Sequence, residues 1–409
     1  MSRFTQIRSL SLAVLATLAP VLAQADPRSK PELLPLEKGQ RILFLGDSIT
    51  HQGHWVNALE LLTMTTRPEL GLRFFNAGVG GDKVTHGLAR LEKEVVASKP
   101  DVVTVLFGMN DAGYVADDAR LLQTFEKDLD ELVQRLKKET SARVVLLGPT
   151  FYDDQSSDPK KKRPWYNETL LKFQAATERV AEAYKVLFLG LNDPMRRVTD
   201  ELRKKDPKAT LSPDAVHPET AGGYAIAGAI AKELWKDPAP VELMLTPTAD
   251  GGPDHVLRIP RIVFPIPPEA RAVADLTKLD ERLNNFVLRA VGVGGGKLAV
   301  IVDGKKIGAW QASELATGVR VGNLPEAPWC SRAQELWGLA EQRRKFIGKE
   351  IRAKVAAIKA IKDEKQRLEA YSKIHAQLEK PWARVHALEE EMGRLCAPFD
   401  VRVVIQPER

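Results

Sequence analysis

Residues 43–50, LFLGDSIT, contain an apolar run that ends abruptly in a glycine, an acid and a hydroxyl. Continuous apolar runs without polar alternation are typical of strands that are buried on both faces of a sheet. The strand predicted here is RILFLG (41–46), and four later runs share its character: LRFFNAG (72–78), DVVTVLFG (101–108), ARVVLLG (142–148) and KVLFLG (185–190).

Helical patterns separate these runs. Residues 116–140 begin with aspartates and end in lysines, as the helix dipole favours, and residues 164–185 form a second amphipathic segment. Strand–helix alternation predicts a parallel sheet with helices on both faces, over residues 40–235. In such folds functional residues gather at the carboxyl ends of the strands.

Composition excludes some functions. The 409 residues include 60 Lys and Arg against 54 Asp and Glu, a net charge of +6. This excess is slight for so long a chain, and no basic patch is interleaved with aromatic residues, so we expect no nucleic-acid partner.

The N-terminal residues resemble an export signal. Arg3 and Arg8 precede an apolar core at residues 10–23, and Ala23-Gln24-Ala25 offers a small-residue cleavage site. We therefore expect a signal peptide over residues 1–25 and a periplasmic or extracellular protein. The apolar run is too short to span a membrane with ease, and no later segment is more apolar, so no stable membrane span is expected.

The pattern changes after the α/β segment, for which we predict a domain over residues 26–236. Residues 237–255 are rich in proline and glycine and are interpreted as a linker. A small β domain is predicted over 256–409, with a hairpin at 297–310 that turns at Asp303-Gly304. Prolines 260, 265, 267 and 268 confine the first strand-like piece to a sheet edge, and DVRVVIQ (400–406) is expected to close the unit.

A helical hairpin is predicted as an insertion in the β domain, over residues 331–395. One apolar stripe includes Leu336, Ile351 and Ile358, with charged runs such as EQRRK (341–345) on the opposite face, and a second is interrupted at Pro381. Two antiparallel helices would bring Cys330 and Cys396 to one end, so a disulfide there is one hypothesis and two buried thiols are the other. Further hypotheses are a homo-oligomer formed through the hairpin, or a hairpin that covers the site.

Polar residues follow several of the predicted strands. Ser48 follows the first, a glycine-rich turn with Gly81 follows the second, and Asn110 follows the third, while Asp214 and His217 precede the last helix. Acyl transfer needs a nucleophile, a base, an orienting carboxylate and donors for the oxyanion. Ser48, His217 and Asp214 can supply the first three, and the amides of Ser48, Gly81 and Asn110 the donors. Separately, Ser48 and Asp214 could each simply cap a helix, and Asn110 could cap a turn.

The four blocks that hold these residues resemble those of the GDSL, or SGNH, hydrolases, in the same order: GDS (46–48), NAGVGGD (76–82), GMND (108–111) and DAVH (214–217). The resemblance covers residues 40–235 and implies a flavodoxin-like five-stranded sheet and ester hydrolysis without metal or organic cofactor. Mapped onto this chain, it implies Ser48 as nucleophile, Gly81 and Asn110 as oxyanion donors, and Asp214 and His217 as the other triad members. Ile49 replaces the family's leucine, and Gly80 is an alternative to Gly81.

The sequence indicates the substrate less directly than it indicates the reaction. Export and an appended β unit are similar to the family's carbohydrate-active members, so O-acetyl esters of a polysaccharide or small acylated molecule are expected. Alternatives are lipid or small-ester hydrolysis, and an inert envelope carbohydrate-binding protein. The C-terminal part also resembles that of secreted GDSL-like proteins of planctomycete-type bacteria. Asp47 is interpreted as bracing its turn. Asp47, His51 and His54 are also weaker candidates for lining the substrate pocket. The two histidines could instead bind a metal ion or have ordinary surface or packing roles, and their spacing without a third ligand is weak evidence for zinc.

Overall fold

A five-stranded parallel sheet organises the first half of the chain. The computed structural model describes residues 33–155, 161–245, 254–359 and 361–408, so the predicted signal peptide lies outside the described residues. The strands are β1 (Arg41–Gly46), β2 (Arg73–Gly78), β3 (Val102–Leu106), β4 (Arg143–Leu147) and β5 (Leu187–Leu189). Their order is β2-β1-β3-β4-β5, which confirms the predicted flavodoxin-like sheet.

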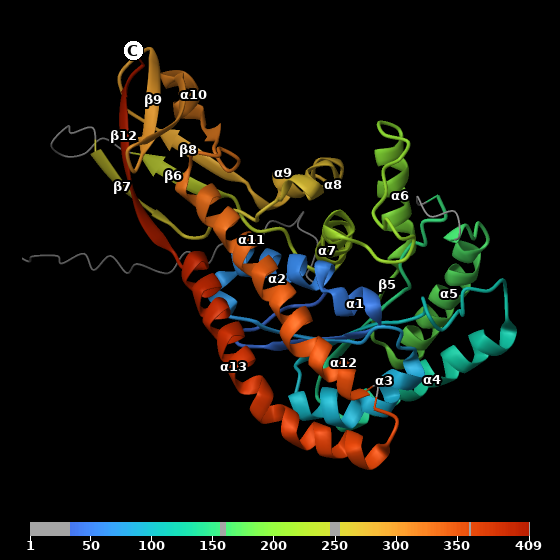
Figure 1. Cartoon of the computed structure of the whole chain (residues 1–409). Helices are drawn as coiled ribbons and strands as arrows, with labels where there is room; N and C mark the ends of the chain where they lie inside the picture. The colour runs from blue at the N-terminus through green and yellow to red at the C-terminus, as the bar shows by residue number, and fades with distance from the viewer. Residues whose placement is uncertain (1–32, 156–160, 246–253, 360, 409) are drawn as a thin grey trace, which may run out of the picture. The chain divides into compact units, whose positions relative to one another are not determined.

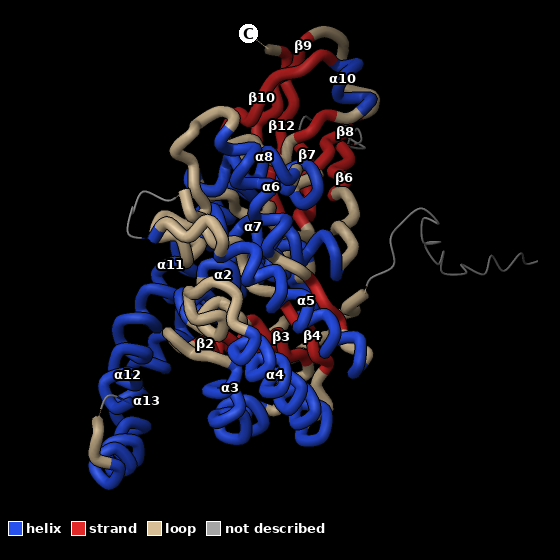
Figure 2. Tube along the Cα trace, turned by 90° about the vertical axis from the view of Figure 1, so that its right-hand side faces the viewer, coloured by secondary structure: helices blue, strands red, loops and turns tan. Residues whose placement is uncertain are grey.

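Helices cover both faces of this sheet. α2 (His54–Thr66) and α7 (Thr220–Leu234) pack together on one face, and α3 (Val84–Arg90) and α4 (Ala119–Glu139) lie on the other (Figures 1 and 2). α5 (Tyr166–Tyr184) packs beside α4, and α6 (Asn192–Arg203) beside α7. Short 3-10 or π segments occupy Pro68–Leu70, Leu91–Val95 and Val96–Ser98. The short helix α1 (Ser48–Gln52) follows β1 directly.

Local sequence explains these elements. β3 is buried along its whole length, as its unbroken apolar run predicts, whereas the edge strand β2 is partly exposed. The Asp118 side chain accepts hydrogen bonds from the amides of Arg120 and Leu121 and so caps α4, while Lys137 and Lys138 occupy its last turn.

The C-terminal part has two small sheets rather than one. The first has the order β10-β9-β12-β7 and the second β11-β8-β6. Their strands are β6 (Val241–Leu245), β7 (Asp254–Ile259), β8 (Phe286–Ala290), β9 (Lys297–Val302), β10 (Lys305–Gln311), β11 (Val319–Arg320) and β12 (Phe399–Pro407). The helices among them are Pro268–Ala270 (a 3-10 turn), α8 (Arg271–Thr277), α9 (Leu279–Leu283) and α10 (Ala312–Thr317).

The predicted linker, residues 237–255, is only partly irregular. Residues 241–245 form β6 because their alternating apolar side chains are buried and the strand pairs in parallel with β8. Residues 246–253 lie outside the described residues. The division into domains at this segment stays a prediction.

Other expectations for the β unit are met. Asp303 and Gly304 join β9 to β10 with positive φ angles of 47° and 81°, as a tight hairpin turn requires. The proline-rich piece supplies β7, which is an edge strand, and β12 lies between β7 and β9.

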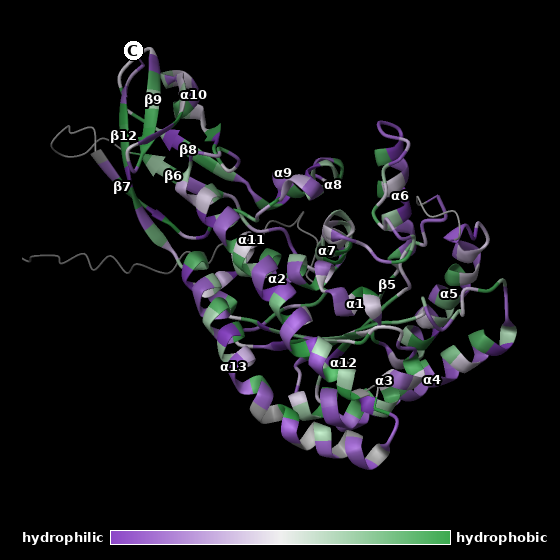
Figure 3. Ribbon diagram, viewed as in Figure 1, coloured by the Kyte–Doolittle hydropathy of each residue, from purple (hydrophilic) through white to green (hydrophobic). Residues whose placement is uncertain are grey.

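The predicted helical hairpin is present between β11 and β12. It comprises α11 (Pro328–Phe346), a π-helical segment (Ile347–Arg352), α12 (Ala353–Lys359) and α13 (Glu364–Cys396). Ile351 of the first arm packs with Ile374, Leu378 and Val385 of the second. α13 continues through Pro381, so the proline that interrupts the second apolar stripe does not end the helix. Figure 3 shows hydrophilic and hydrophobic residues alternating along α13, as expected of a helix with one buried stripe.

The two cysteines are free thiols, so the disulfide hypothesis is wrong and its alternative is correct. Cys330 and Cys396 are both buried in the main core. The Cys330 Sγ donates to the carbonyl oxygen of Gly322 instead of forming a bond to the other sulfur. Burial raises the pKa of each thiol to about 12.

Among the described residues, no helix is both long enough and apolar enough to cross a membrane.

Candidate active site

The nucleophile candidate lies where β1 turns into α1. Asp47, 1% exposed, is the N-cap of α1, and its Oδ1 accepts a hydrogen bond from the amide of Ile49 at 2.9 Å. Ser48 follows as the first residue of the helix and is only partly buried. The carboxylate of Asp47 is therefore engaged inside the turn before α1, and Ser48 is the less buried of the two residues.

Ser48 is linked to the two residues predicted from the loop before α7. His217 Nε2 lies 2.8 Å from Ser48 Oγ, and His217 Nδ1 lies 2.6 Å from Asp214 Oδ2. A hydroxyl, an imidazole and a carboxylate thus stand in one hydrogen-bonded chain. Proton transfer from the hydroxyl to the imidazole needs this reach between heavy atoms.

The loop that carries Asp214 is shaped to hold its carboxylate on His217. Ala215, buried between the two, has a φ of 74°, and Asp214 Oδ1 accepts from the amides of Val216 (3.0 Å) and His217 (2.7 Å). Burial raises the pKa of Asp214, but these bonds and the imidazole bond outweigh it and lower the pKa to about 2. Asp214 is therefore ionised across the neutral range and oriented by the backbone.

The predicted oxyanion donors lie on neighbouring loops. Gly81 has a φ of 76°, in the region that favours glycine, and a Cβ at Gly80 or Gly81 would meet nothing within 4 Å, so this turn is open. The Asn110 Nδ2 donates to the carbonyl oxygen of Asp82 at 3.0 Å and lies 3.4 Å from Asp47 Oδ2. This contact joins the loop after β3 to the turn that holds Ser48.

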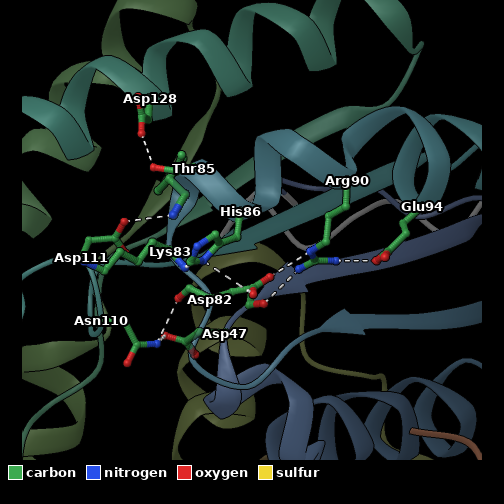
Figure 4. Close-up of polar contacts among 12 residues, drawn as sticks. Asp47, Asp82, Lys83, Thr85, His86, Arg90, Glu94, Asn110, Asp111 and Asp128 are labelled. Carbon is green, nitrogen blue, oxygen red and sulfur yellow. Dashed lines mark hydrogen bonds and ion pairs between the residues drawn. The ribbon is translucent and has the colours of Figure 1, made fainter. Parts of the chain in front are cut away.

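A buried acidic network supports these loops (Figure 4). Asp111 accepts hydrogen bonds from the amides of Val84 and Gly108, each at 2.9 Å, and fixes the loop that carries Asn110. The Arg90 guanidinium donates to Asp82 Oδ2 at 2.9 Å and to the carbonyl oxygen of Gly46 at 3.2 Å. The second, glycine-rich loop is thereby tied to the end of β1.

Burial controls the charge of this network. Burial, together with the nearby charges of Asp111 and Asp82, raises the pKa of Asp47 to about 7. Burial also raises the pKa of Asp111 to about 6, although three backbone hydrogen bonds and the charge of Lys83 oppose it. Asp47 and Asp111, which brace the loops around the candidate nucleophile, therefore have pKa values close to neutrality, unlike Asp214.

The two histidines among the weaker candidates, His51 and His54, are placed differently from each other. His51 Nδ1 lies 3.1 Å from the carbonyl oxygen of Gly78, on the carboxyl edge of the sheet. His54 Nδ1 lies 3.4 Å from Thr220 Oγ1, and burial, with Arg344, lowers its pKa to about 4. His54 is thus a neutral contact between α2 and α7. The described residues hold no group of three His, Cys, Asp or Glu side chains arranged to bind a metal ion.

Sequence reasoning missed two side chains that touch the predicted ones. The Tyr114 hydroxyl donates to Asn110 Oδ1 at 3.1 Å, and Tyr114 has a φ of 57°. The spacing of four residues after Asn110 was the available signal. The Lys161 Nζ donates to the carbonyl oxygen of Asp214 at 2.9 Å and lies 3.5 Å from its Oδ2. No local pattern marks Lys161, because 53 residues separate it from Asp214.

A parallel sheet of this order, with a serine after β1 in contact with a histidine before the last helix, defines an SGNH-type α/β hydrolase. Residues 44–225 match the model of the GDSL-like Lipase/Acylhydrolase family. Over these residues the chain is similar to that family, and the protein is a carboxylic ester hydrolase.

Individual relatives are similar over different lengths. An acetylxylan esterase of Geobacillus stearothermophilus is 28% identical over 222 residues, which are 49% of this chain and 96% of that protein. The alpha1 subunit of platelet-activating factor acetylhydrolase IB of Bos taurus is 32% identical over 113 residues, 27% of this chain and 44% of that protein.

One solved structure shares the fold over nearly the whole chain. It is that of a gut microbial diltiazem-metabolizing enzyme, with a TM-score of 0.75, 23% sequence identity, and coverage of 92% of this chain and 99% of that chain. At this identity the likeness concerns the fold alone, including the C-terminal part.

Proposed function

We propose that this protein hydrolyses O-acetyl esters of carbohydrate through a Ser48–His217–Asp214 triad. The observation that carries the proposal is the continuous chain of contacts from Ser48 Oγ through His217 to Asp214, at 2.8 and 2.6 Å. A binding protein with an inert site has no need of a hydroxyl, an imidazole and a carboxylate in this order.

In the proposed reaction, His217 Nε2 takes the proton of Ser48 Oγ as that oxygen attacks the acyl carbon. The same nitrogen then gives the proton to the departing alcohol, which leaves an acyl-serine. Water repeats the sequence: His217 takes its proton, the new oxygen bonds to the acyl carbon, and the proton returns to Ser48. Asp214 stabilises the imidazolium formed in each half.

The oxyanion is proposed to be held by the amides of Ser48 and Gly81 and the side-chain amide of Asn110. The φ of 76° at Gly81 and its open surroundings support a turn whose backbone faces the substrate. The Asn110 side chain is fixed at both ends, because its Oδ1 accepts from Tyr114 and its Nδ2 donates to Asp82 O. In the proposal, the bond to the oxyanion replaces the longer Nδ2 contact, the one at 3.4 Å to Asp47 Oδ2.

The acetyl group and the sugar are proposed from the relatives. An acetylxylan esterase and an acetylhydrolase subunit are both similar to this chain, and both names refer to removal of an acetyl group. We propose export as well, on the pattern of residues 1–25.

A fluorophosphonate probe tests the nucleophile. We expect the wild type to be labelled at one site, Ser48→Ala to take up no label, and the matched variant Ser331→Ala, changed at an exposed serine, to label as the wild type does. Equal labelling of wild type and Ser48→Ala would overturn the assignment.

A second experiment tests the substrate. We expect acetate release from acetylated xylan or pectin fragments, and aryl esters cleaved in the order acetate, butyrate, palmitate. A preference for palmitate, or release from aryl acetate with none from any acetylated polysaccharide or oligosaccharide, would favour lipid or small-ester hydrolysis instead.

A further inference from the structure

The helical hairpin, although inserted in the C-terminal β unit, reaches the helix that begins with Ser48. Arg344 of α11 donates through one terminal nitrogen to the carbonyl oxygen of Gln52 at 3.0 Å. Its other two nitrogens donate to the carboxylate of Glu341 at 2.9 and 2.8 Å, which fixes the guanidinium. The last residue of α1 is thus capped by a side chain 292 positions later.

A second arginine of the hairpin supports α1 indirectly. Arg352 donates to the backbone oxygen of Asn76 at 3.3 Å. The side chain of Asn76 in turn donates to the carbonyl oxygen of Thr50 at 2.6 Å and accepts from the amide of Gly78 at 2.9 Å. Asn76 therefore joins the end of β2 to the end of α1, and the Arg352 guanidinium binds the backbone of that same residue.

The π-helical segment brings both arginines to the same side of the hairpin. Eight residues separate Arg344 from Arg352, about 2.2 turns of an α-helix, so a regular helix would turn them away from each other by about a fifth of a turn. Residues 347–352 form the wider turns of a π-helix, which reduce this offset. Burial, with the neighbouring charge of Arg344, lowers the pKa of Arg352 to about 10, so the Arg352 guanidinium stays charged at neutral pH.

A helix as short as α1 needs this support. Five residues allow few internal hydrogen bonds, and the last carbonyl oxygens of any helix lack partners within it. The amide of Gly53 binds Thr50 O at 3.1 Å, Asn76 binds the same oxygen, and Arg344 binds Gln52 O. A cation at this end also interacts favourably with the helix dipole.

The hairpin is itself anchored to the catalytic sheet's covering helix. Arg343 forms a buried ion pair with Glu60 of α2, one of whose bonds is 2.8 Å long, and Glu341 accepts from Asn57 at 3.2 Å. The arginines that reach α1 therefore project from a support that is fixed to α2, on the same face of the sheet.

We propose that Arg344 and Arg352 are positioning residues for Ser48: the hairpin fixes the carboxyl end of α1 and so sets the place of the hydroxyl at the other end. The inference rests on the proposed triad. The C-terminal part of the chain then contributes to catalysis through α1.

Kinetics and hydrogen exchange together test the proposal. For Arg344→Met we expect kcat on an aryl acetate to fall about tenfold or more with KM within about twofold, since a displaced nucleophile loses rate more than binding. The fluorophosphonate labelling rate should fall by the same factor, and deuterium uptake by residues 48–53 should rise. Arg352→Met should give a smaller change in the same direction.

Two further variants separate positioning from general destabilisation. Arg344→Lys keeps a cation at the end of α1 and should recover part of kcat. Arg332→Met, on the same helix but stacked on Phe399 of the β unit, should leave kcat and uptake at residues 48–53 unchanged. The proposal is overturned if Arg344→Met leaves both readouts unchanged, or if Arg332→Met reduces kcat as much.

Failure of the proposal can be told from failure of the proposed function. If wild type takes no fluorophosphonate label, the triad assignment fails, whatever deuterium uptake shows. If wild type and Arg344→Met are labelled at the same rate, the triad stands and the positioning role is overturned.

Discussion

His217 Nε2 lies 2.8 Å from Ser48 Oγ although 169 residues separate them in the sequence. The sheet order explains the approach. β1 lies between β2 and β3, so Ser48 follows an inner strand at the carboxyl edge of the sheet. α7 packs against α2, the helix that follows α1. The loop before α7 is thereby delivered to the serine, and a residue can join the site only by standing at one of these few chain ends.

The first prediction concerns Asp214. Asp214→Asn should reduce kcat on an aryl acetate about 10²- to 10⁴-fold, because the amide no longer holds the imidazole in its reactive tautomer. The exposed Asp206→Asn serves as the matched control and should keep full activity. Steady-state kinetics measure kcat for the two variants, and equal kcat values would show that Asp214 is not part of the triad.

The pH profile of the wild type gives a second check on the same chain. The pKa of Asp214 is lowered to about 2, so this carboxylate stays ionised at any pH above that and does not shape the profile in the assay range. Protonation of the imidazole on acidification should instead reduce kcat/KM, since His217 could no longer accept the serine proton. A flat profile between pH 5 and 9 would exclude histidine as the base.

The oxyanion loop can be tested through Tyr114. Asn110→Ala should lower kcat about 10²- to 10³-fold, the usual cost of losing one donor to the developing negative charge. Tyr114→Phe removes only the hydroxyl that donates to Asn110 Oδ1 and should lower kcat less, at unchanged KM. In the double variant the effect of Tyr114→Phe should vanish; additive losses would show that the tyrosine acts elsewhere.

Asp47 makes a prediction about stability. Its folded pKa of about 7 lies above the ordinary 3.8, so its contribution is fully present below pH 3.8 and is lost as the pH rises through 7. At pH 8 the buried charge costs at most about 4 kcal/mol. Asp47→Asn retains a capping side chain and should unfold at higher urea than the wild type at pH 8, and this difference should shrink as the pH falls from 7 towards 3.8. An identical pH dependence in both proteins would contradict this, since Asp111 alone would then account for it.

The ion pair between Arg343 of the hairpin and Glu60 of α2 gives a second prediction about stability. Both Arg343 and Glu60 are 7% exposed, so Arg343→Met leaves a buried carboxylate without its partner and should cost about 3–5 kcal/mol of unfolding free energy. The double change Arg343→Met with Glu60→Leu should recover much of that loss. Urea unfolding of the two single and the double variant measures the coupling; additive costs would mean that the pair does not hold the hairpin.

Much of the fold could be predicted because its signals are local. The apolar runs gave the five strands, and the polar residues behind them fell on one edge because a parallel sheet places them there. Asp303-Gly304 predicted a turn by its own backbone preferences. β6 was missed because prolines and glycines surround five residues whose alternation is ordinary for a strand.

The contacts of the hairpin could not be predicted. The run EQRRK (341–345) was expected to face solvent, yet Glu341, Arg343 and Arg344 all contact the catalytic half of the chain. A charged run gives no sign of which of its members will find partners, and here those partners lie 283 to 292 residues away. Pro381 lies inside α13 without ending it, because the packing of α13 against α11 outweighs the hydrogen bond that proline removes.

The last prediction follows from the two thiols. Cys330 and Cys396 are 8% and 3% exposed and burial raises the pKa of both to about 12, so neither forms a thiolate at neutral pH. The native protein should therefore resist iodoacetamide, whereas protein unfolded in guanidinium without reductant should gain two carbamidomethyl groups by intact mass. Because the thiols are not joined, reductant should leave the unfolding midpoint unchanged. A mass unchanged in guanidinium until reductant is added would show a disulfide after all, and would restore the clamp at the base of the hairpin.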